Sequence, residues 1–252
     1  MRGDEILASK DLEPRQKTRQ VASWLHLAGF LLIGAGVVAM GFLAQHSSTG
    51  GGGPTAPGQL GSHSQAIHIY LVAILMDWAL LYYCWAGVHH RGGGLGTISG
   101  GRWTSWKSAA VDLGIVVPFW ALWESSAYAV HLLLGPSSAK TVDSLLPQSF
   151  LEVLLWIATS ITAGFCEEIA FRGYLQRQFH ALSGSAAAAV LAQGLVFGLF
   201  HSYQGWKNVI VIFVLGVLYG MLAAWRKNLR ANIVAHAFSD IWEGWLKFVV
   251  WR

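Results

Sequence analysis

Long runs of apolar residues divide the chain into segments of membrane-spanning length. A helix needs roughly 20 apolar residues to cross about 30 Å of hydrocarbon. The sequence shows neither the apolar/polar alternation that is typical of strands nor an internal repeat. We therefore predict an all-α polytopic membrane bundle, and an extra break in the second, third or fourth span would raise the number of spans to eight. The seven expected spans are Val21–Gln45, Ala66–His89, Ala109–Leu134, Phe150–Phe165 with a continuation to about His180, Ala186–His201, Val209–Trp225 and Ala231–Val249.

The segments between the spans organise the chain into one membrane domain with a polar tail. Residues 1–20 carry mixed charge and few apolar side chains, so we interpret them as a cytoplasmic tail. His46–Ser64 is rich in Gly, Ser and Pro and is expected to be an external loop, whereas Arg91–Gly101 is expected to be an internal connector. The helices then fall into an N-terminal group, residues 21–145, and a C-terminal group, residues 146–252.

Composition supports a membrane protein, and the placement of charge predicts its topology. The 252 residues are 54% hydrophobic and 12% charged, with a mean hydropathy of +0.46, which excludes an ordinary soluble domain. A net charge of +4 could suggest nucleic acid as a partner. The basic residues instead fall on alternate connectors, so the positive-inside rule predicts a cytoplasmic N-terminus, an external C-terminus and no nucleic-acid partner. The inner residues are Arg2, Lys10, Arg15, Lys17, Arg19, Arg91, Arg102, Lys107, Arg172, Arg177, Arg226, Lys227 and Arg230, and the outer ones are Lys140, Lys207, Lys247 and Arg252.

Small residues and cysteines inside the spans are interpreted as packing groups. The pairs Gly194-x-x-x-Gly198 and Gly216-x-x-x-Gly220 have the spacing that lets membrane helices approach closely. Cys84 and Cys166 lie in apolar segments, so no disulfide framework is expected. Cys166 adjoins Glu167, but no histidine lies near it in the sequence, and a buried packing residue is preferred over a nucleophile.

A double carboxylate closed by an arginine is the first polar cluster, in the segment Glu167–Arg172. Charges are costly in hydrocarbon, so such a cluster is a candidate functional site. In a helix Glu168 and Arg172 stand at i and i+4 and can pair. Glu167 is rotated about 100° away and gains no arginine from this spacing. One carboxylate is therefore neutralised, and the other is available for chemistry.

Histidines mark two further polar clusters. The apolar run that begins at Phe197 ends at His201. Asn232, His236 and Asp240 repeat at i, i+4 and i+8 and form one polar stripe on an otherwise apolar helix. Lipid would penalise this stripe, so it should face the protein interior or a wet cavity.

The three clusters could meet in space. A short turn at about Leu182–Ser185 would make the fourth and fifth spans an antiparallel helical hairpin. At a rise of about 1.5 Å per residue, the depths of Glu167 and His201 would then differ by about 6 Å. His236 begins its span on the same cytoplasmic side. We therefore expect a shared site in the cytoplasmic half of the membrane.

Such a site suits the activation of water. Glu167, partly desolvated and without an arginine partner, could act as a general base. The histidines could orient the water, stabilise an oxyanion or protonate a leaving amine. Asp240, one helical turn from His236, could fix the tautomer of that ring. Asn232 is interpreted as a helix–helix hydrogen-bonding group or a cap rather than as a reacting group.

In order and spacing, these residues resemble the CAAX prenyl endopeptidase type II family, also called the CPBP or Abi intramembrane proteases. The family pattern is E-E-x-x-x-R, then F-x-x-x-H, then H-x-x-x-N or H-x-x-x-D. The matching positions here are Glu167, Glu168, Arg172, Phe197, His201, His236 and Asp240, and the resemblance covers roughly residues 150–245.

The resemblance implies an intramembrane endopeptidase whose fold usually has eight transmembrane helices. It implies that Glu167 activates water with His201, that His236 and Asp240 stabilise the oxyanion, and that Glu168 and Arg172 hold the geometry. Residues 146–252 would be the catalytic helices. The substrate would be a membrane-associated peptide or protein. It is a prenylated CaaX protein for eukaryotic members, whereas many bacterial relatives are linked to peptide processing or bacteriocin immunity.

The sequence leaves a divalent metal open. The two histidines with Asp240 or Glu167 could supply the three protein ligands of a catalytic zinc site. However, no H-E-x-x-H is present, and one carboxylate must remain as the base. The family has been described both as metalloproteases and as metal-independent glutamate proteases. We favour a site that requires no metal or other cofactor.

Two other functions are compatible with the chain. Asp77, Glu124 and His131 are intramembrane polar groups outside the motifs, and they could mark the ion path of a transporter. The concentration of polar clusters in one half of the chain argues against it. A catalytically silent scaffold or immunity protein is the stronger alternative, and it predicts that the motif residues are dispensable. With no retention signal in the sequence, we expect a multi-pass protein of a bacterial-type plasma membrane.

Overall fold

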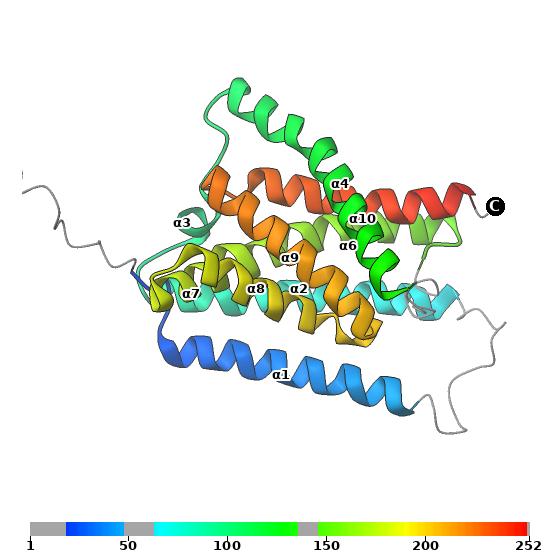
Figure 1. Cartoon of the computed structure of the whole chain (residues 1–252), viewed down its shortest axis with the longest axis horizontal. Coiled ribbons are helices and arrows are strands. Elements are labelled where there is room, and N and C mark those ends of the chain that lie inside the picture. The colour runs from blue at the N-terminus through cyan, green and yellow to red at the C-terminus, as the bar shows by residue number, and fades with distance from the viewer. Residues whose placement is uncertain (1–18, 48–62, 136–145, 251–252) are drawn as a thin grey trace, which may run out of the picture.

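The computed structural model describes residues 19–47, 63–135 and 146–250, and these form an all-helical bundle (Figure 1). No strand occurs within the described residues, so the predicted all-α class is confirmed. A π-helix, η1, joins α6 to α7, and a 3-10 turn, η2, joins α8 to α9. In chain order the elements are α1 (Trp24–Ser47), α2 (His63–His89), α3 (Leu95–Ser99), α4 (Trp106–Leu134), α6 (Phe150–Glu167), η1 (Glu168–Leu175), α7 (Gln176–Ser183), α8 (Ala186–Phe200), η2 (Ser202–Gln204), α9 (Trp206–Arg226) and α10 (Arg230–Val250).

All seven predicted spans form helices, with ends within three residues of those expected. Within the described residues, five helices are long and apolar enough to cross a membrane: Trp24–Leu43, Gln65–His89, Trp106–Leu134, Phe150–Ser183 and Trp206–Arg226. The fourth is the continuous helix of α6, η1 and α7. α8 is a shorter apolar helix, and α10 carries the polar stripe. The chain is therefore an integral membrane protein.

Two predicted connectors fall mainly outside the described part of the chain, and a third contains an unexpected helix. The predicted tail, residues 1–20, and the predicted loop His46–Ser64 lie almost wholly in the undescribed ranges 1–18 and 48–62. The connector Arg91–Gly101 holds the short helix α3, which packs against η1. This connector is rich in glycine and has no periodic apolar pattern, so its sequence did not predict a helix.

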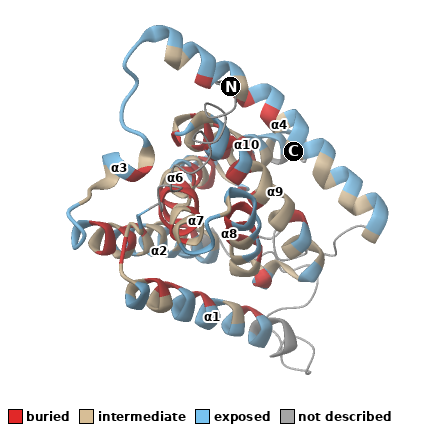
Figure 2. Cartoon of the chain, turned by 60° about the vertical axis from the view of Figure 1, so that its left-hand side comes forward, coloured by how far each residue is buried: buried red, intermediate tan, exposed pale blue. Residues whose placement is uncertain are grey.

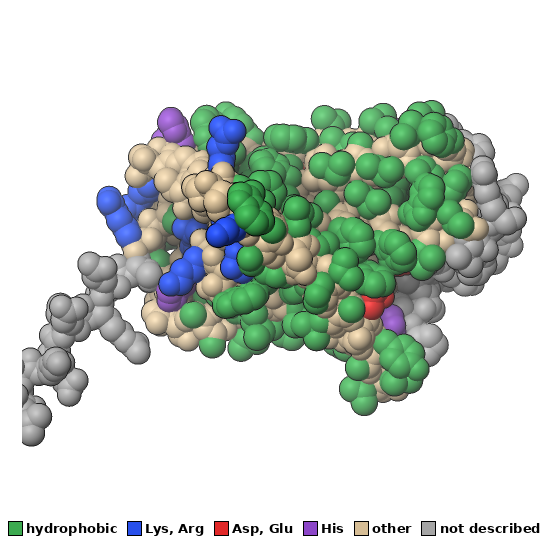
Figure 3. Space-filling model, turned by 90° about the horizontal axis from the view of Figure 1, so that it is seen from above, with side chains coloured by type: hydrophobic (Ala, Val, Ile, Leu, Met, Phe, Trp, Pro, Cys, Tyr) green, Lys and Arg blue, Asp and Glu red, His purple; other side chains and the backbone are tan. Residues whose placement is uncertain are grey.

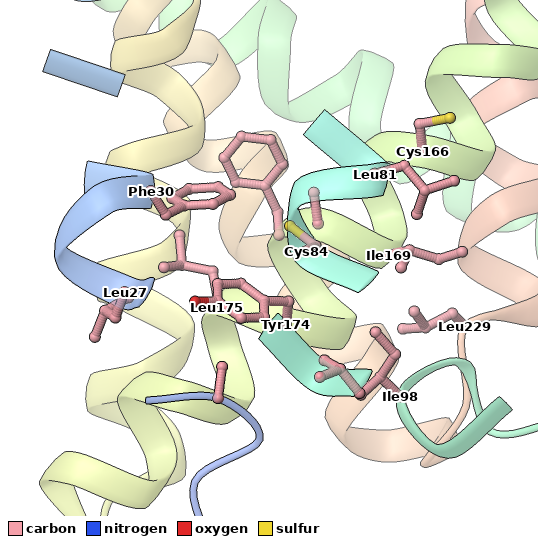
Figure 4. Close-up of a cluster of buried hydrophobic side chains, with 14 of the residues drawn as sticks. Leu27, Phe30, Leu81, Cys84, Ile98, Cys166, Ile169, Tyr174, Leu175 and Leu229 are labelled. Atoms are coloured by element: carbon pink, nitrogen blue, oxygen red, sulfur yellow. The ribbon is translucent and has the colours of Figure 1, made fainter. Parts of the chain in front are cut away.

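Buried residues concentrate on the inner helices, whereas the outer helices α1 and α4 are largely exposed (Figure 2). Leu32 and Met40 on α1 and Leu133 on α4 are 73%, 72% and 84% exposed, as lipid-facing residues should be. The largest core cluster joins α1, α2 and η1 through side chains such as Phe30 and Tyr174 (Figure 4). Cys84 and Cys166 are free and buried in this cluster, as predicted for packing residues.

The predicted turn between the fourth and fifth spans is confirmed. α7 ends at Ser183, and Gly184 has φ 67°, a left-handed conformation that favours glycine after a helix. The Ser185 hydroxyl then accepts a hydrogen bond from the Ala188 N–H and caps α8. α7 and α8 pack against each other as the predicted antiparallel hairpin.

α8 and α9 approach closely along a line of glycines. A Cβ added to Gly216 would lie 2.8 Å from the Cα of Gly194, and one added to Gly198 would lie 2.7 Å from the Val209 carbonyl oxygen. A flexible side chain could move away from such a contact, but the backbone of a packed helix cannot. The predicted small-residue pairs therefore do set the distance between these helices.

Replacing Gly216 with valine is expected to lower the free energy of unfolding by about 1–3 kcal/mol, because the new side chain would be forced against the α8 backbone. The midpoint of thermal unfolding in detergent measures the effect. Gly36→Val is the matched control, because a Cβ at Gly36 on α1 meets nothing within 4 Å. An equal loss in both variants would show that helix propensity, not the α8–α9 distance, is responsible.

Cationic residues gather at one end of the bundle, where they bind neighbouring connectors. Asp112, fully buried near the start of α4, accepts hydrogen bonds from Arg226 Nη2 at 2.6 Å and Arg230 Nε at 3.0 Å. Arg177, at the start of α7, donates from Nη1 to the Thr97 carbonyl oxygen of α3 at 2.9 Å. Figure 3 shows the visible Lys and Arg side chains, in blue, at this end.

Candidate active site

Glu168 is the buried centre of the polar cluster. Its carboxylate is fully buried and accepts hydrogen bonds from Arg172 Nη1 at 2.8 Å, His236 Nδ1 at 2.9 Å and Asn232 Nδ2 at 3.1 Å. The predicted i, i+4 ion pair of Glu168 and Arg172 is therefore confirmed. With three donors directed at it, this carboxylate is fixed in place as a structural anion.

The Arg172 side chain is enclosed by aromatic rings. Its guanidinium carbon lies 4.3 Å from the ring centroid of Phe197 and 5.1 Å from that of Tyr219. Nη2 also lies 3.4 Å from the Gly216 carbonyl oxygen. Cation–π contacts of a desolvated guanidinium are among the stronger ones, so the arginine joins η1, α8 and α9 around Glu168.

A π-helix, which the sequence analysis did not predict, carries this ion pair. η1 covers Glu168–Leu175, and the Gln176 N–H donates to the Phe171 carbonyl oxygen, one residue further back than in an α-helix. All eight residues of η1 are buried. Such π turns occur frequently at functional sites, and this one begins at the second carboxylate of the motif.

Glu167 has different surroundings from its neighbour. Its side chain is 17% exposed, whereas that of Glu168 is 0% exposed. Glu167 Oε2 lies 3.8 Å from His236 Nε2, and Asp240 Oδ2 lies 3.7 Å from the same nitrogen. These separations are too long for direct hydrogen bonds. His236 thus binds Glu168 through one ring nitrogen and presents the other between two carboxylates.

The orientation of His236 differs from our expectation. We expected Asp240 to fix the tautomer of this ring, but Nδ1 instead donates its hydrogen bond to the carboxylate of Glu168, on a different helix. The packing of α10 against α6 places the Glu168 carboxylate beside the ring. Asn232 is a helix–helix hydrogen-bonding group, as predicted, because its Nδ2 also donates to the Tyr219 carbonyl oxygen at 2.8 Å.

His201 lies at the end of α8 with its ring orientation defined. Its Nδ1 is 2.9 Å from the Phe197 carbonyl oxygen. Because a carbonyl oxygen can only accept, Nδ1 carries the hydrogen, and Nε2 of the neutral ring is an acceptor. The Phe197 ring contacts His201 and His236, at centroid distances of 5.0 and 6.2 Å, and forms a wall between them.

A cavity of about 1010 Å³ joins the candidate residues. Glu167, His201, His236 and Asp240 all line it, whereas its described lining does not include Glu168 or Arg172. A concave space of this size with a few converging polar groups is typical of ligand and active sites. The structure therefore brings the three sequence clusters together and separates them into a lining group and a supporting group.

Three intramembrane polar residues outside the motifs also lie at or near this cavity. Glu124 and His131 of α4 line it. Asp77 of α2 is close enough to interact electrostatically with Glu167, His236 and Asp240. The position of Asp77 beside these residues was not predicted. The sequence shows Asp77 as a carboxylate in the middle of an apolar span, which marks it as unusual. It lies too far along the chain from the other clusters for its spacing to predict a contact with them.

The described residues contain no group of three His, Cys, Asp or Glu side chains arranged to hold a metal ion. His236 Nε2 lies 3.8 Å from Glu167 Oε2 and 3.7 Å from Asp240 Oδ2. Two ligands of a tetrahedral zinc ion, each 2.0–2.2 Å from the metal, would lie about 3.3 Å from each other.

The helical bundle and its cluster of glutamates, histidines and arginine define an integral membrane protein with a buried polar centre. Residues 149–242, from the start of α6 into α10, match the type II CAAX prenyl endopeptidase Rce1-like family. The matched segment contains all three motifs, and the match confirms the resemblance seen in the sequence. No curated protein and no solved structure matches the chain.

Proposed function

We propose that the protein is an intramembrane endopeptidase in which Glu167 is the general base. The observation that carries this proposal is the different surroundings of two adjacent glutamates. Glu168 is occupied by three hydrogen bonds, whereas Glu167 faces a cavity that His201 and His236 also line. The match of residues 149–242 to the Rce1-like family supports the protease class.

In the proposed mechanism, Glu167 accepts a proton from a water molecule as the water oxygen bonds to the substrate carbonyl carbon. His201 orients this water by accepting its second hydrogen at Nε2. His236, held at Nδ1 by Glu168, donates from Nε2 to the oxyanion when its ring is protonated, and Asp240 supports that charge. Glu167 then passes its proton to the leaving nitrogen as the carbon–nitrogen bond breaks.

Residues 146–252 form the catalytic helices, and residues 21–145 complete the bundle. The substrate is a membrane-associated peptide or protein, with or without a prenyl group, and no metal is required. The N-terminus lies in the cytoplasm, and the host membrane is a bacterial-type plasma membrane.

To test the activity, the detergent-purified protein is incubated with a farnesylated CaaX peptide and with the same peptide lacking farnesyl. Mass spectrometry quantifies the released tripeptide, beside the variant Glu167→Gln and beside a sample with a metal chelator. Release by the wild type, unaffected by chelator and absent in the variant, is expected with at least one peptide. Equal release by the variant would refute the role of Glu167, and release abolished by chelator would refute a metal-independent mechanism.

A further inference from the structure

The cavity occupies one end of the bundle rather than its centre. On α2 its lining residues lie near the helix start, from His68 to Ala73, and on α4 they lie near the helix end, from Trp123 to His131. On α9 they lie in the first two thirds, from Asn208 to Tyr219. Because these helices alternate in direction, all three stretches lie toward the same end.

The opposite end is the cationic one. Arg177, Arg226 and Arg230 lie there and bind α3 and the start of α4. The Leu229 N–H donates to the Ser99 carbonyl oxygen at 2.8 Å, so the α9–α10 turn belongs to this end too. The described lining of the cavity includes no Lys or Arg, but it includes the carboxylates of Glu124, Glu167, Asp240 and Glu243.

The expected site in the cytoplasmic half of the membrane stays a prediction, and the length of the helix that carries Glu167 bears on its depth. We expected Glu167 and His201 to lie at similar depths, counted from the α7–α8 turn. The helix Phe150–Ser183 has 34 residues, which is about 51 Å at about 1.5 Å per residue and exceeds the roughly 30 Å of hydrocarbon. Glu167 is therefore near the middle of this helix, and the polar α7 extends beyond the hydrocarbon.

We propose that the cavity is open toward the non-cytoplasmic side of the membrane, and that the site binds a peptide segment presented there. The positive-inside rule assigns the cationic end to the cytoplasm, and the cavity extends from the catalytic cluster in the other direction. The carboxylates of its lining favour basic or uncharged peptide segments over acidic ones. Resting on the proposed function, this makes an exported or externally exposed peptide the substrate, in place of a cytosolic CaaX tail.

The test uses a small, membrane-impermeant, cationic methanethiosulfonate on single-cysteine probes in the full chain. Leu215→Cys places a thiol in the lining of the cavity, midway along α9. Met221→Cys on the same helix is the matched control, because Met221 is 57% exposed on the lipid-facing surface. Ser183→Cys marks the cationic end. The unsubstituted chain gives the background, because both of its cysteines are buried.

The reagent is added to spheroplasts and, separately, to sealed inverted vesicles, and mass spectrometry measures the fraction of modified protein. We expect Leu215→Cys to react at least tenfold faster in spheroplasts, Ser183→Cys to react faster in inverted vesicles, and Met221→Cys to stay at background. Faster reaction of Leu215→Cys in inverted vesicles, or reaction only after detergent is added, would overturn the proposal. Because labelling requires no catalysis, a failed peptidase assay and a failed access experiment remain distinguishable.

Discussion

Replacing Glu167 with glutamine is expected to lower kcat for peptide-bond hydrolysis by about 10²–10⁴-fold, the contribution that is typical of a positioned general base. Glutamine keeps the shape of the side chain but cannot accept the proton of the attacking water. The Glu167 carboxylate lies 3.8 Å from His236 Nε2, too far for a direct hydrogen bond. The thermal unfolding midpoint should therefore stay close to that of the wild type. Initial rates and a melting curve measure the two quantities.

Glu243→Gln is the matched control for this substitution. Glu243 lines the same cavity, one turn of α10 beyond Asp240 and outside the motif cluster. Its replacement removes the same charge from the same cavity. If the loss of a negative charge in the cavity were enough to slow the reaction, the rates of both variants would fall alike. The proposal expects a loss at Glu167 that is at least tenfold larger, and comparable losses would refute a specific role for this carboxylate.

Much of the fold could be predicted because its signals are local. Apolar runs of membrane length identified each span, and the glycine and serine at 184 and 185 marked the turn of the hairpin. The i, i+4 spacing of Glu168 and Arg172 was sufficient to predict their ion pair, since this spacing brings side chains together on one helix face. The separation of the two glutamates into different roles followed from the same geometry.

The missed features depend on contacts between distant segments. The π turn at η1 is a change of hydrogen-bond register, which an apolar pattern does not encode. The bond between Glu168 and His236 requires α10 to lie beside α6, and a sequence gives only the spacing of His236 to its own neighbour Asp240. The position of Asp77 likewise depends on how α2 packs against α6.

Replacing Glu168 with glutamine is expected to destabilise the protein by about 3–5 kcal/mol, the usual cost of removing one partner of a buried ion pair. Arg172 would remain in a site where its side chain is 0% exposed, with no carboxylate to balance its charge. The amide would also offer one acceptor oxygen where the carboxylate receives three donors, from Arg172, His236 and Asn232. Thermal unfolding in detergent should show a large fall in the midpoint, unlike that of Glu167→Gln.

A double variant separates the stability role of this pair from its role in catalysis. Glu168→Leu combined with Arg172→Met removes both charges, and replacing a buried ion pair with apolar residues is often neutral or stabilising. Stability should therefore recover relative to Glu168→Gln. Activity should not recover, because His236 loses the carboxylate that fixes Nδ1 and aims Nε2 into the cavity. A double variant that is both stable and fully active would show that the ion pair only holds the helices together. A stable but inactive one would assign to Glu168 the positioning of His236.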